Sequence, residues 1–322
     1  MKSILVSGGT GFVGNSLCPR LFDGGWSVCV AMRGSRDKHT LVSGCEGVTV
    51  GGIGADTDWR PFLKDIDSVV HLAARVHVMR NPATDPLADF RWVNVDGTFN
   101  LAKQAADAGV RRFVFVSSIK VNGEETVVGR PFTENDQSAP QDAYAISKWE
   151  AEQNLLKLAS ETEMEVVIIR PPLVYGPGVK ANFFTMMRWL AHGIPLPLGA
   201  IHNRRSLVAL DNLIDLLVTC IDHPAAANQV FLVSDGEDMS TSELLRRTAA
   251  ALGKPARLLP VPQAILTLGL KLLRKDAFAQ RLCGSLQVDI TKARTLLGWN
   301  PPVGVDAALM KTAHHFLEHQ WS

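Results

Sequence analysis

The first 170 residues alternate between short apolar runs and stretches that repeat apolar residues at helical spacing. The apolar runs predict strands, and they lie at 4–6, 27–32, 48–50, 68–72, 112–116 and 166–169. The stretch 92–108 has a helical repeat that stops at Gly109, and a second helix is expected to open after the turn at 140–142. Strands that alternate with helices predict right-handed crossovers and a parallel sheet with helices on both faces.

Beyond Pro171 the pattern changes, because glycine, proline and asparagine become frequent and the apolar runs become short. Helices are predicted at 211–222, 240–252 and 291–297, with one further strand of the sheet at 230–233. The sequence contains no internal repeat and no low-complexity linker, so we expect this half to pack on the first half as a cap.

The first apolar run leads into a glycine-rich turn that contains Gly8, Gly9, Gly11 and Gly14. A strand, a tight turn and a helix that opens at Phe12 would point backbone N–H groups at a pyrophosphate. Glycine clusters also mark ordinary turns, but this one lies between a strand and a helix, as in a dinucleotide site. We therefore predict an α/β fold, with a Rossmann-type doubly wound parallel sheet and a smaller mixed α/β C-terminal substrate-binding domain.

The predicted strand at 27–32 ends at Arg33, where a dinucleotide site meets the adenosine ribose. An acidic residue there favours NAD, whereas an arginine can pair with a 2′-phosphate, so Arg33 predicts a preference for NADP(H), with NAD(H) as the alternative. Arg36 and Lys38 add positive charge nearby. A solvated loop arginine is the non-functional interpretation. The small residues Ala73 and Ala74 would let the backbone pass close under a bound cofactor.

Tyr144 and Lys148 are four residues apart on one predicted helix, so they share a face. An adjacent ammonium and a bound nicotinamide would favour the tyrosine phenolate. Ser118, at the end of the strand 112–116, can hold a substrate hydroxyl or carbonyl for proton exchange with Tyr144. A Tyr-x-x-x-Lys pair alone is usually structural, but behind a glycine-rich turn and a strand-end serine it predicts a hydride-transfer site.

The amino-acid composition limits which kinds of partner and cofactor are expected. The 322 residues include 33 basic and 32 acidic ones, which gives no broad attraction for nucleic acid or an anionic membrane. Five scattered cysteines without a Cys-x-x-Cys pair argue against disulfides and a zinc site, and fit a cytoplasmic protein without a metal. The apolar segment 264–273 is too short to span a bilayer and contains Lys271. We expect it to be a helix packed on its own core, with peripheral membrane contact as the alternative.

The motifs GGTGFVG, HLAA, VNVDGT, FVFVSS, YAISKWEAE, RPPLVYGPG and LLGWNPP together resemble the extended short-chain dehydrogenase/reductases. The resemblance covers essentially the whole chain and is specific for the nucleotide-sugar branch, which contains UDP-glucose 4-epimerase and the sugar-nucleotide 4-ketoreductases. It implies that Ser118, Tyr144 and Lys148 form the catalytic triad and that Lys148 also holds the nicotinamide ribose. It also implies that Asn94 supports the active-site helix.

The resemblance assigns further residues to ligands. The residues expected at the cofactor are Gly8, Thr10, Gly11, Phe12, Val13, Gly14, Arg33, Ile53, Leu72, Ala73, Ala74, Asn94, Tyr144, Lys148 and Pro171. Asn182, Arg205 and Arg281 are expected at the UDP diphosphate, where arginines bind by forked hydrogen bonds. Surface ion pairs are the alternative for each arginine.

Two segments depart from the family pattern. An aspartate that often contacts adenine is replaced in Gly51-Gly52-Ile53, so this contact is missing or made by backbone. Lys120 and Asn122 follow the active serine in an unusual sequence, and they either contact a polar sugar substituent or face solvent.

The resemblance also implies domain limits and an assembly. Residues 1–173, joined by 206–235, would form the dinucleotide-binding domain, and 174–205 with 236–322 the nucleotide-sugar-binding domain. Relatives often dimerise through the helix that carries the catalytic tyrosine. Ala151, Leu155 and Leu158 on that helix permit a homodimer, although an intramolecular core would explain them equally well.

Two reactions at C4 of a UDP-hexose are compatible with these residues. Arg33 and the sequence SSIKVNGE favour an NADPH-dependent reductase, similar to bacterial enzymes that reduce UDP-4-keto-6-deoxy-N-acetylhexosamine in surface-polysaccharide (O-antigen) synthesis. The alternative is an NAD-dependent 4-epimerase of a UDP-hexose or UDP-N-acetylhexosamine. A non-catalytic NADP-binding protein would require a broken triad, yet all three residues are present.

Overall fold

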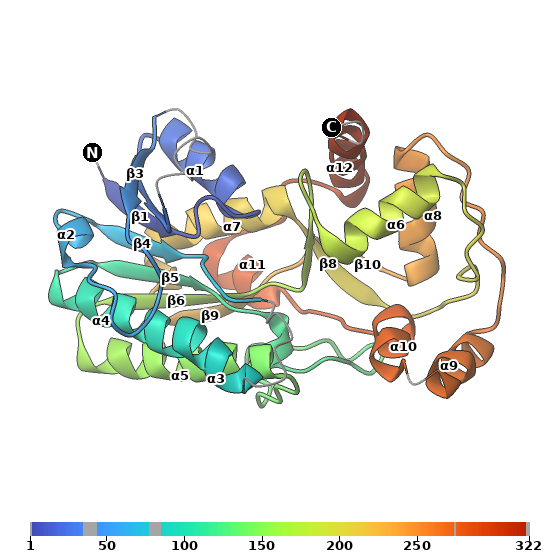
Figure 1. Cartoon of the computed structure of the whole chain (residues 1–322), viewed down its shortest axis with the longest axis horizontal. Coiled ribbons are helices and arrows are strands. Elements are labelled where there is room, and N and C mark those ends of the chain that lie inside the picture. The colour runs from blue at the N-terminus through green and yellow to red at the C-terminus, as the bar shows by residue number, and fades with distance from the viewer. Residues whose placement is uncertain (1, 35–43, 77–84, 274, 320–322) are drawn as a thin grey trace.

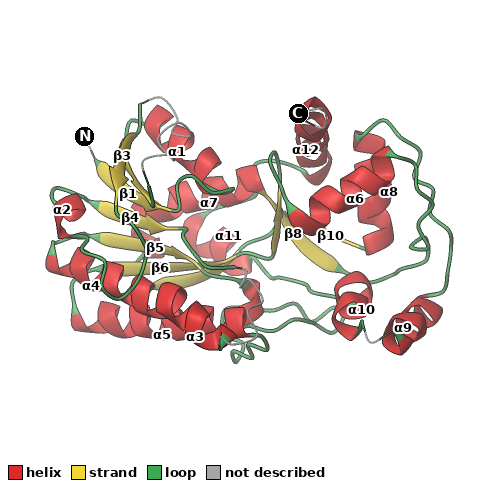
Figure 2. Cartoon of the chain, viewed as in Figure 1, coloured by secondary structure: helices red, strands yellow, loops and turns green. Residues whose placement is uncertain are grey.

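The computed structural model describes residues 2–34, 44–76, 85–273 and 275–319. A seven-stranded sheet with helices on both faces forms one part of the molecule, on the left of Figure 1, and a smaller part with a three-stranded sheet lies on the right. Figure 2 shows that helices surround the strands in both parts.

The large sheet is parallel throughout. Its strands, in spatial order, are β3 (Glu46–Thr49), β2 (Ser27–Met32), β1 (Ser3–Ser7), β4 (Ser68–His71), β5 (Arg112–Val116), β6 (Glu165–Arg170) and β9 (Gln229–Leu232). The strand order reverses between β1 and β4, and ligands of such sheets bind at the carboxyl ends of the strands at this point. The central strands are buried on both sides, as expected for a parallel sheet.

Two layers of helices cover this sheet. One face packs against α1 (Gly14–Asp23), α7 (Leu210–Asp222) and α11 (Thr291–Leu297). The other face packs against α2 (Arg60–Leu63), α4 (Thr98–Asp107) and α5 (Ala143–Glu161). Ala151, Leu155 and Leu158 of α5 are buried in this second core, so the intramolecular interpretation of these three residues is correct.

The smaller part has its own core. Its sheet has the order β10 (Asp238–Met239), β8 (Arg205–Ala209), β7 (Leu173–Tyr175). Its helices are α6 (Ala181–Ala191), α8 (Thr241–Ala251), α9 (Gln263–Leu272), α10 (Asp276–Cys283) and α12 (Val305–His319). Apolar residues of α6, α8 and α12 meet in one buried cluster.

The fold class predicted from the sequence is confirmed, and strand 230–233 joins the large sheet as β9. The expected helix 92–108 begins earlier than predicted, because α3 (Pro86–Arg91) continues through a π-helical turn, Trp92–Gly97, into α4. Helix α1 begins at Gly14 rather than Phe12. The expectation that 264–273 packs on its own core is met on one side only, because Leu266 packs on the core of the smaller part while no residue of α9 is fully buried.

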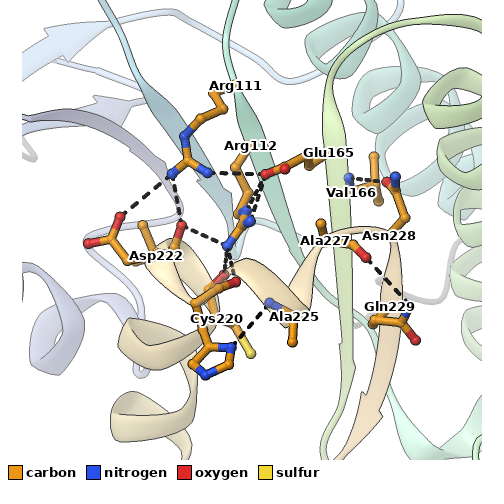
Figure 3. Close-up of polar contacts among 12 residues, drawn as sticks. Arg111, Arg112, Glu165, Val166, Cys220, Asp222, Ala225, Ala227, Asn228 and Gln229 are labelled. Atoms are coloured by element: carbon orange, nitrogen blue, oxygen red, sulfur yellow. Dashed lines mark hydrogen bonds and ion pairs between the residues drawn. The ribbon is translucent and has the colours of Figure 1, made fainter. Parts of the chain in front are cut away.

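The amino ends of β5 and β6 are tied to the end of α7 by a buried arginine (Figure 3). The Arg112 guanidinium donates to the carbonyls of Cys220, Ile221 and His223 at 2.9, 3.1 and 2.8 Å, and it pairs with Glu165 at 2.6 Å. The Cys220 and Ile221 carbonyls lie in the last turn of α7, where no helical N–H follows to bond them, so Arg112 satisfies this turn. The His223 carbonyl, just beyond the helix, also accepts from the Ala226 N–H at 3.0 Å.

Within the described residues, no helix is both long and apolar enough to cross a membrane. The domain limits given above remain a prediction.

Candidate functional site

The glycine-rich turn is built against the end of β4. Gly8 has a φ of +74°, and a Cβ at this residue would lie 2.6 Å from the amide nitrogen of Ala73. A Cβ on Gly14 would lie 2.4 Å from the Cα of Gly9, so both glycines are required by close backbone contact. The first turn of α1 has no side-chain cap and no acidic residue. The N–H groups of Asn15, Ser16 and Leu17 donate to the carbonyls of Gly11 and Val13, so an anion there would meet the N–H groups that precede Asn15.

The other residues expected around this turn lie there. Thr10, Phe12 and Val13 are partly buried between β1 and α1, and Gly11 is exposed and donates its N–H to the Gly8 carbonyl at 3.0 Å. This arrangement fits a pyrophosphate site, because only glycines allow the turn to pack this closely between the end of β1 and the start of α1.

Asn94 connects the end of β4 to α5. Its Oδ1 accepts from the Arg75 N–H at 2.8 Å, and its Nδ2 donates to the Arg75 carbonyl and to Ser147 Oγ, both at 3.0 Å. The π-helical turn carries this buried side chain. Asn94 thus fixes the segment after Leu72, Ala73 and Ala74 against the helix that bears Tyr144.

Arg33 is exposed directly after β2, at the place predicted for it, whereas Arg36 and Lys38 lie outside the described residues. Ile53 is partly buried beside a hollow of about 360 Å³ that is also lined by Asp56, Asp58 and Trp92. The adenine contact expected at Ile53 remains a prediction.

Ser118 follows β5 and caps a short 3-10 helix, Ile119–Val121, by accepting from the Lys120 N–H at 3.3 Å. The buried Pro171 accepts from the Ile119 N–H at 3.0 Å, so the ends of β5 and β6 hold this turn. Ser117 Oγ is buried without a hydrogen-bond partner in the described structure. An unpartnered buried hydroxyl beside Ser118 is consistent with a ligand at this strand end.

Tyr144 is in the first turn of α5, whose N-cap is Asp142. The Asp142 carboxylate accepts from the Ala145 N–H at 2.7 Å and also pairs with the Lys120 ammonium. Lys120 bonds Glu124 at 3.0 Å as well, so it is paired and partly buried rather than free in solvent, and a contact with a sugar substituent remains a prediction. Although partial burial opposes the shift, these carboxylates raise the pKa of Lys120.

Burial, with a contribution from the Asp142 charge, raises the pKa of Tyr144 to about 12. The sequence predicted that the Lys148 ammonium and a bound nicotinamide together would favour the phenolate. In the protein alone the pKa of Tyr144 is raised instead, because burial disfavours the charged phenolate.

Lys148 is 2% exposed, and its ammonium lies 3.9 Å from the centre of the Phe115 ring. Burial lowers its pKa to about 7, opposed by the charge of Glu152. The same ring stacks on His71, with centroids 5.8 Å apart. Burial and the Lys148 charge lower the pKa of His71 to about 3, so it is neutral and hydrogen-bonds Ser7 and Thr98.

Asn122 is buried, and its amide is held within the protein. It donates to the Thr133 carbonyl and accepts from Arg170, both at 2.9 Å. Arg170 also pairs with the fully buried Glu152 of α5. The solvent-facing alternative for Asn122 is therefore wrong, and these bonds give it a structural role, while a sugar contact through its second amide hydrogen remains a prediction.

The residues expected at the diphosphate lie on three elements of the smaller part. Arg205, on β8, donates to the Gly284 carbonyl at 3.0 Å, and burial lowers the pKa of its guanidinium. Arg281, on α10, lies close enough to both Arg205 and Asp142 for its charge to act on them. Asn182 is exposed in the first turn of α6.

Three parts of the site were not predicted from the sequence. They are the Lys120–Asp142 cap, the stack of Lys148 on Phe115 and His71, and the buried Glu152–Arg170 pair. The cap could have been predicted in part, since aspartate is a preferred N-cap residue and Asp142 directly precedes the predicted helix. The others depend on strand neighbours far apart in the chain.

Comparisons with known proteins agree with this arrangement. The model of the NAD dependent epimerase/dehydratase family matches residues 4–234. A UDP-glucose 4-epimerase from Vibrio cholerae is 52% identical over 321 residues, which covers 98% of this chain and 96% of that protein.

Solved structures have the same fold. A UDP-glucuronic acid 4-epimerase from Bacillus cereus in complex with NAD has a TM-score of 0.79 at 20% identity, covering 98% of this chain and 99% of the other. A UDP-glucose 4-epimerase from Thermotoga maritima with UDP-glucose has a TM-score of 0.76 at 23% identity, covering 99% of both. Since a family model spans most of the sequence and a near full-length relative shares half of its residues, the chain belongs to the NAD dependent epimerase/dehydratase family, in the nucleotide-sugar branch of the extended short-chain dehydrogenase/reductases.

Proposed function

We infer that the protein is a 4-epimerase of a UDP-hexose or UDP-N-acetylhexosamine that works with retained NAD(H). The observation that carries this proposal is the likeness to a UDP-glucose 4-epimerase over 98% of the chain, in a protein that keeps Ser118, Tyr144 and Lys148 at one strand end. The sequence motifs favoured a 4-ketoreductase. Likeness along the whole chain outweighs a few segments, so the reductase becomes the alternative.

The residues of the site fit a nicotinamide dinucleotide. Close backbone contacts at Gly8 and Gly14 make the tight turn that a pyrophosphate site requires, and the N-terminus of α1 has no side-chain cap. Lys148 makes no hydrogen bond within the described structure, so its ammonium can donate to a ribose. Arg33 could pair with the 2′-phosphate of NADP(H), so binding of this cofactor in addition to NAD(H) is expected.

The chain's own residues provide the proton transfer. When bound, the nicotinamide supplies the acceptor and donor of the C4 hydride. Ser118 Oγ holds the sugar O4, and Tyr144 Oη takes the O4 proton and later returns it. The protein alone keeps Tyr144 protonated, so the positive charge gathered around it on binding must lower its pKa before it acts as a base.

The substrate diphosphate is assigned to Arg205 and Arg281, with Asn182 as an amide donor. Burial lowers the pKa of the Arg205 guanidinium, and Arg281 lies nearby. An anion would stabilise both positive charges, and the UDP diphosphate provides two negative charges. This assignment leaves the hexose facing Ser118 and Tyr144.

The decisive experiment separates the two reactions by their cofactor balance. The purified protein is incubated with UDP-glucose and with UDP-N-acetylglucosamine without a reductant, and the products are identified by NMR. C4 epimers formed without net cofactor consumption support the epimerase. Consumption of NADPH with a UDP-4-keto-6-deoxy sugar, and no epimer, would establish the reductase instead.

A cytoplasmic location, a role in surface-polysaccharide synthesis and a homodimer remain proposals. The dimer would have to use residues other than Ala151, Leu155 and Leu158, because these are buried within one chain.

A further inference from the structure

Helix α9 presents an apolar face to solvent. Ile265, Leu268 and Leu272 recur at i, i+3 and i+7 along it, and they are 61%, 61% and 77% exposed. The exposed positions of α9 are Ala264, Ile265, Leu268, Gly269, Lys271 and Leu272. Only one of these is polar, which is the reverse of the pattern on a surface helix of a globular protein.

The helix is anchored by its opposite side. Leu266 packs on the core of the smaller part, and Gln263 donates to the Cys283 carbonyl at the end of α10 at 3.3 Å. The two helices lie side by side at the end of the molecule farthest from β3 (Figure 1). The outward direction of the apolar face is therefore fixed by packing.

Further exposed apolar side chains extend this face. Leu259 precedes α9, and Leu273 and Phe278 follow its last turn, all large and exposed. Single exposed apolar residues are ordinary, but six large ones between positions 259 and 278, on two adjacent helices and the segment before them, indicate an interaction surface.

The segment of the chain that carries this face is rich in basic residues. Lys271 and Lys275 are exposed beside it. Between positions 253 and 283 the sequence has six basic residues and one acidic residue, although the whole chain is nearly neutral. Apolar side chains flanked by lysines are the pattern of a helix that lies in the interface of an anionic bilayer.

We propose that α9, with Leu259, Leu273 and Phe278, docks the protein on the surface of a membrane that contains anionic lipids. A second copy of the chain fits less well, because a two-fold contact through this face would bring Lys271 and Lys275 of both copies together. Helix α10 carries Arg281, so docking would place the proposed diphosphate site one helix away from the lipid headgroups.

The test measures binding of the full-length protein to lipid vesicles by sedimentation. One set contains phosphatidylcholine alone and the other an equal mixture with phosphatidylglycerol. We expect binding to the anionic set that weakens as salt is raised. Leu268→Glu should reduce the bound fraction on the order of tenfold, because it places a charge in the docked face. A combined K271E and K275E variant should lose the preference for anionic vesicles.

The matched control is Met310→Glu, which changes a 58% exposed apolar residue on α12 and should bind as the wild type does. Thermal unfolding checks that each variant is folded. Absence of wild-type binding, or equal binding by Leu268→Glu, would overturn the proposal. So would a wild-type dimer that Leu268→Glu dissociates without any vesicle binding. No turnover is measured, so failure of the proposed epimerase activity would not affect this result.

Discussion

The Lys148 ammonium packs over the face of the Phe115 ring, 3.9 Å from its centre, at the carboxyl end of the large sheet. This contact partly replaces water around the charge, but burial still lowers the pKa of Lys148 to about 7. Burying the Lys148 ammonium therefore destabilises the folded protein, at the position where the nicotinamide ribose is expected to bind.

Lys148→Met should stabilise the protein while abolishing turnover. The folded-state pKa of Lys148 lies below its ordinary value of 10.5, so the unfolded chain binds more protons between about pH 7 and 10.5. The free energy of unfolding of the wild type therefore rises with pH across that window. The difference in stability between the variant and the wild type shrinks over the same range. We expect a gain of about 2 kcal/mol at pH 7, measured by urea unfolding. Lys157→Met, an exposed lysine on the same helix, should change neither quantity. A variant less stable than the wild type at pH 7 would refute this.

Tyr144→Phe should lower kcat by about a thousandfold with little change in unfolding temperature, because only the proton-transferring hydroxyl is lost. The control is Tyr175→Phe at the other tyrosine of the chain. Tyr175 is buried and donates to Asp235 at 2.8 Å, so this variant should lose about 1–2 kcal/mol of stability and retain turnover. Wild-type turnover by Tyr144→Phe would exclude Tyr144 as the acid and base.

Asp142→Asn should lower the pKa of Tyr144 from about 12, because the Asp142 charge contributes to raising it. Asparagine keeps the N-cap, so the helix should remain intact. We expect the pKa of Tyr144 to fall by about 0.5 to 1. Ultraviolet titration in a Tyr175→Phe background observes Tyr144 alone. An unchanged or higher pKa in Asp142→Asn would contradict the assigned role.

Gly14→Ala should abolish binding of NAD and cost about 1–3 kcal/mol of stability, because its Cβ would lie 2.4 Å from the Gly9 Cα. Gly304→Ala is the control, since a Cβ there meets nothing within 4 Å. Calorimetric titration with NAD measures the difference. Equal affinities of the two variants would show that this turn does not hold the pyrophosphate.

Arg33→Asp should weaken binding of NADP at least about tenfold and leave binding of NAD unchanged or improved, because a carboxylate repels the 2′-phosphate and can bind the ribose hydroxyls. The ratio of the two dissociation constants is the readout. If this ratio stays constant, Arg33 is a solvated loop residue.

The strands were predictable because each depends on a local apolar run that the buried sheet requires, as in β2 and β5, whose limits match the prediction. The glycine-rich turn and the triad were predictable for a similar reason, since they form fixed local motifs. The π-helical turn was missed because one extra residue per turn leaves the apolar repeat of 92–108 almost unchanged.

Long-range partners were not predictable from local pattern. Lys120 pairs with Asp142, 22 residues away, and Asn122 with Arg170, 48 residues away. The exposed face of α9 was not predicted for another reason. An apolar segment normally predicts burial, and only the position of the neighbouring elements decides whether a face is covered.

The bonds from Arg112 to the end of α7 also bear on the synthesis of the protein. Arg112 and His223 are 111 residues apart, so a ribosome adding roughly 5 to 20 residues per second needs roughly 5 to 20 seconds to supply the carbonyls that this guanidinium binds. Until then β6 lacks its neighbour β9 and is an open sheet edge, able to pair with another nascent chain. The interval between these two segments is therefore when the growing polypeptide most needs a chaperone.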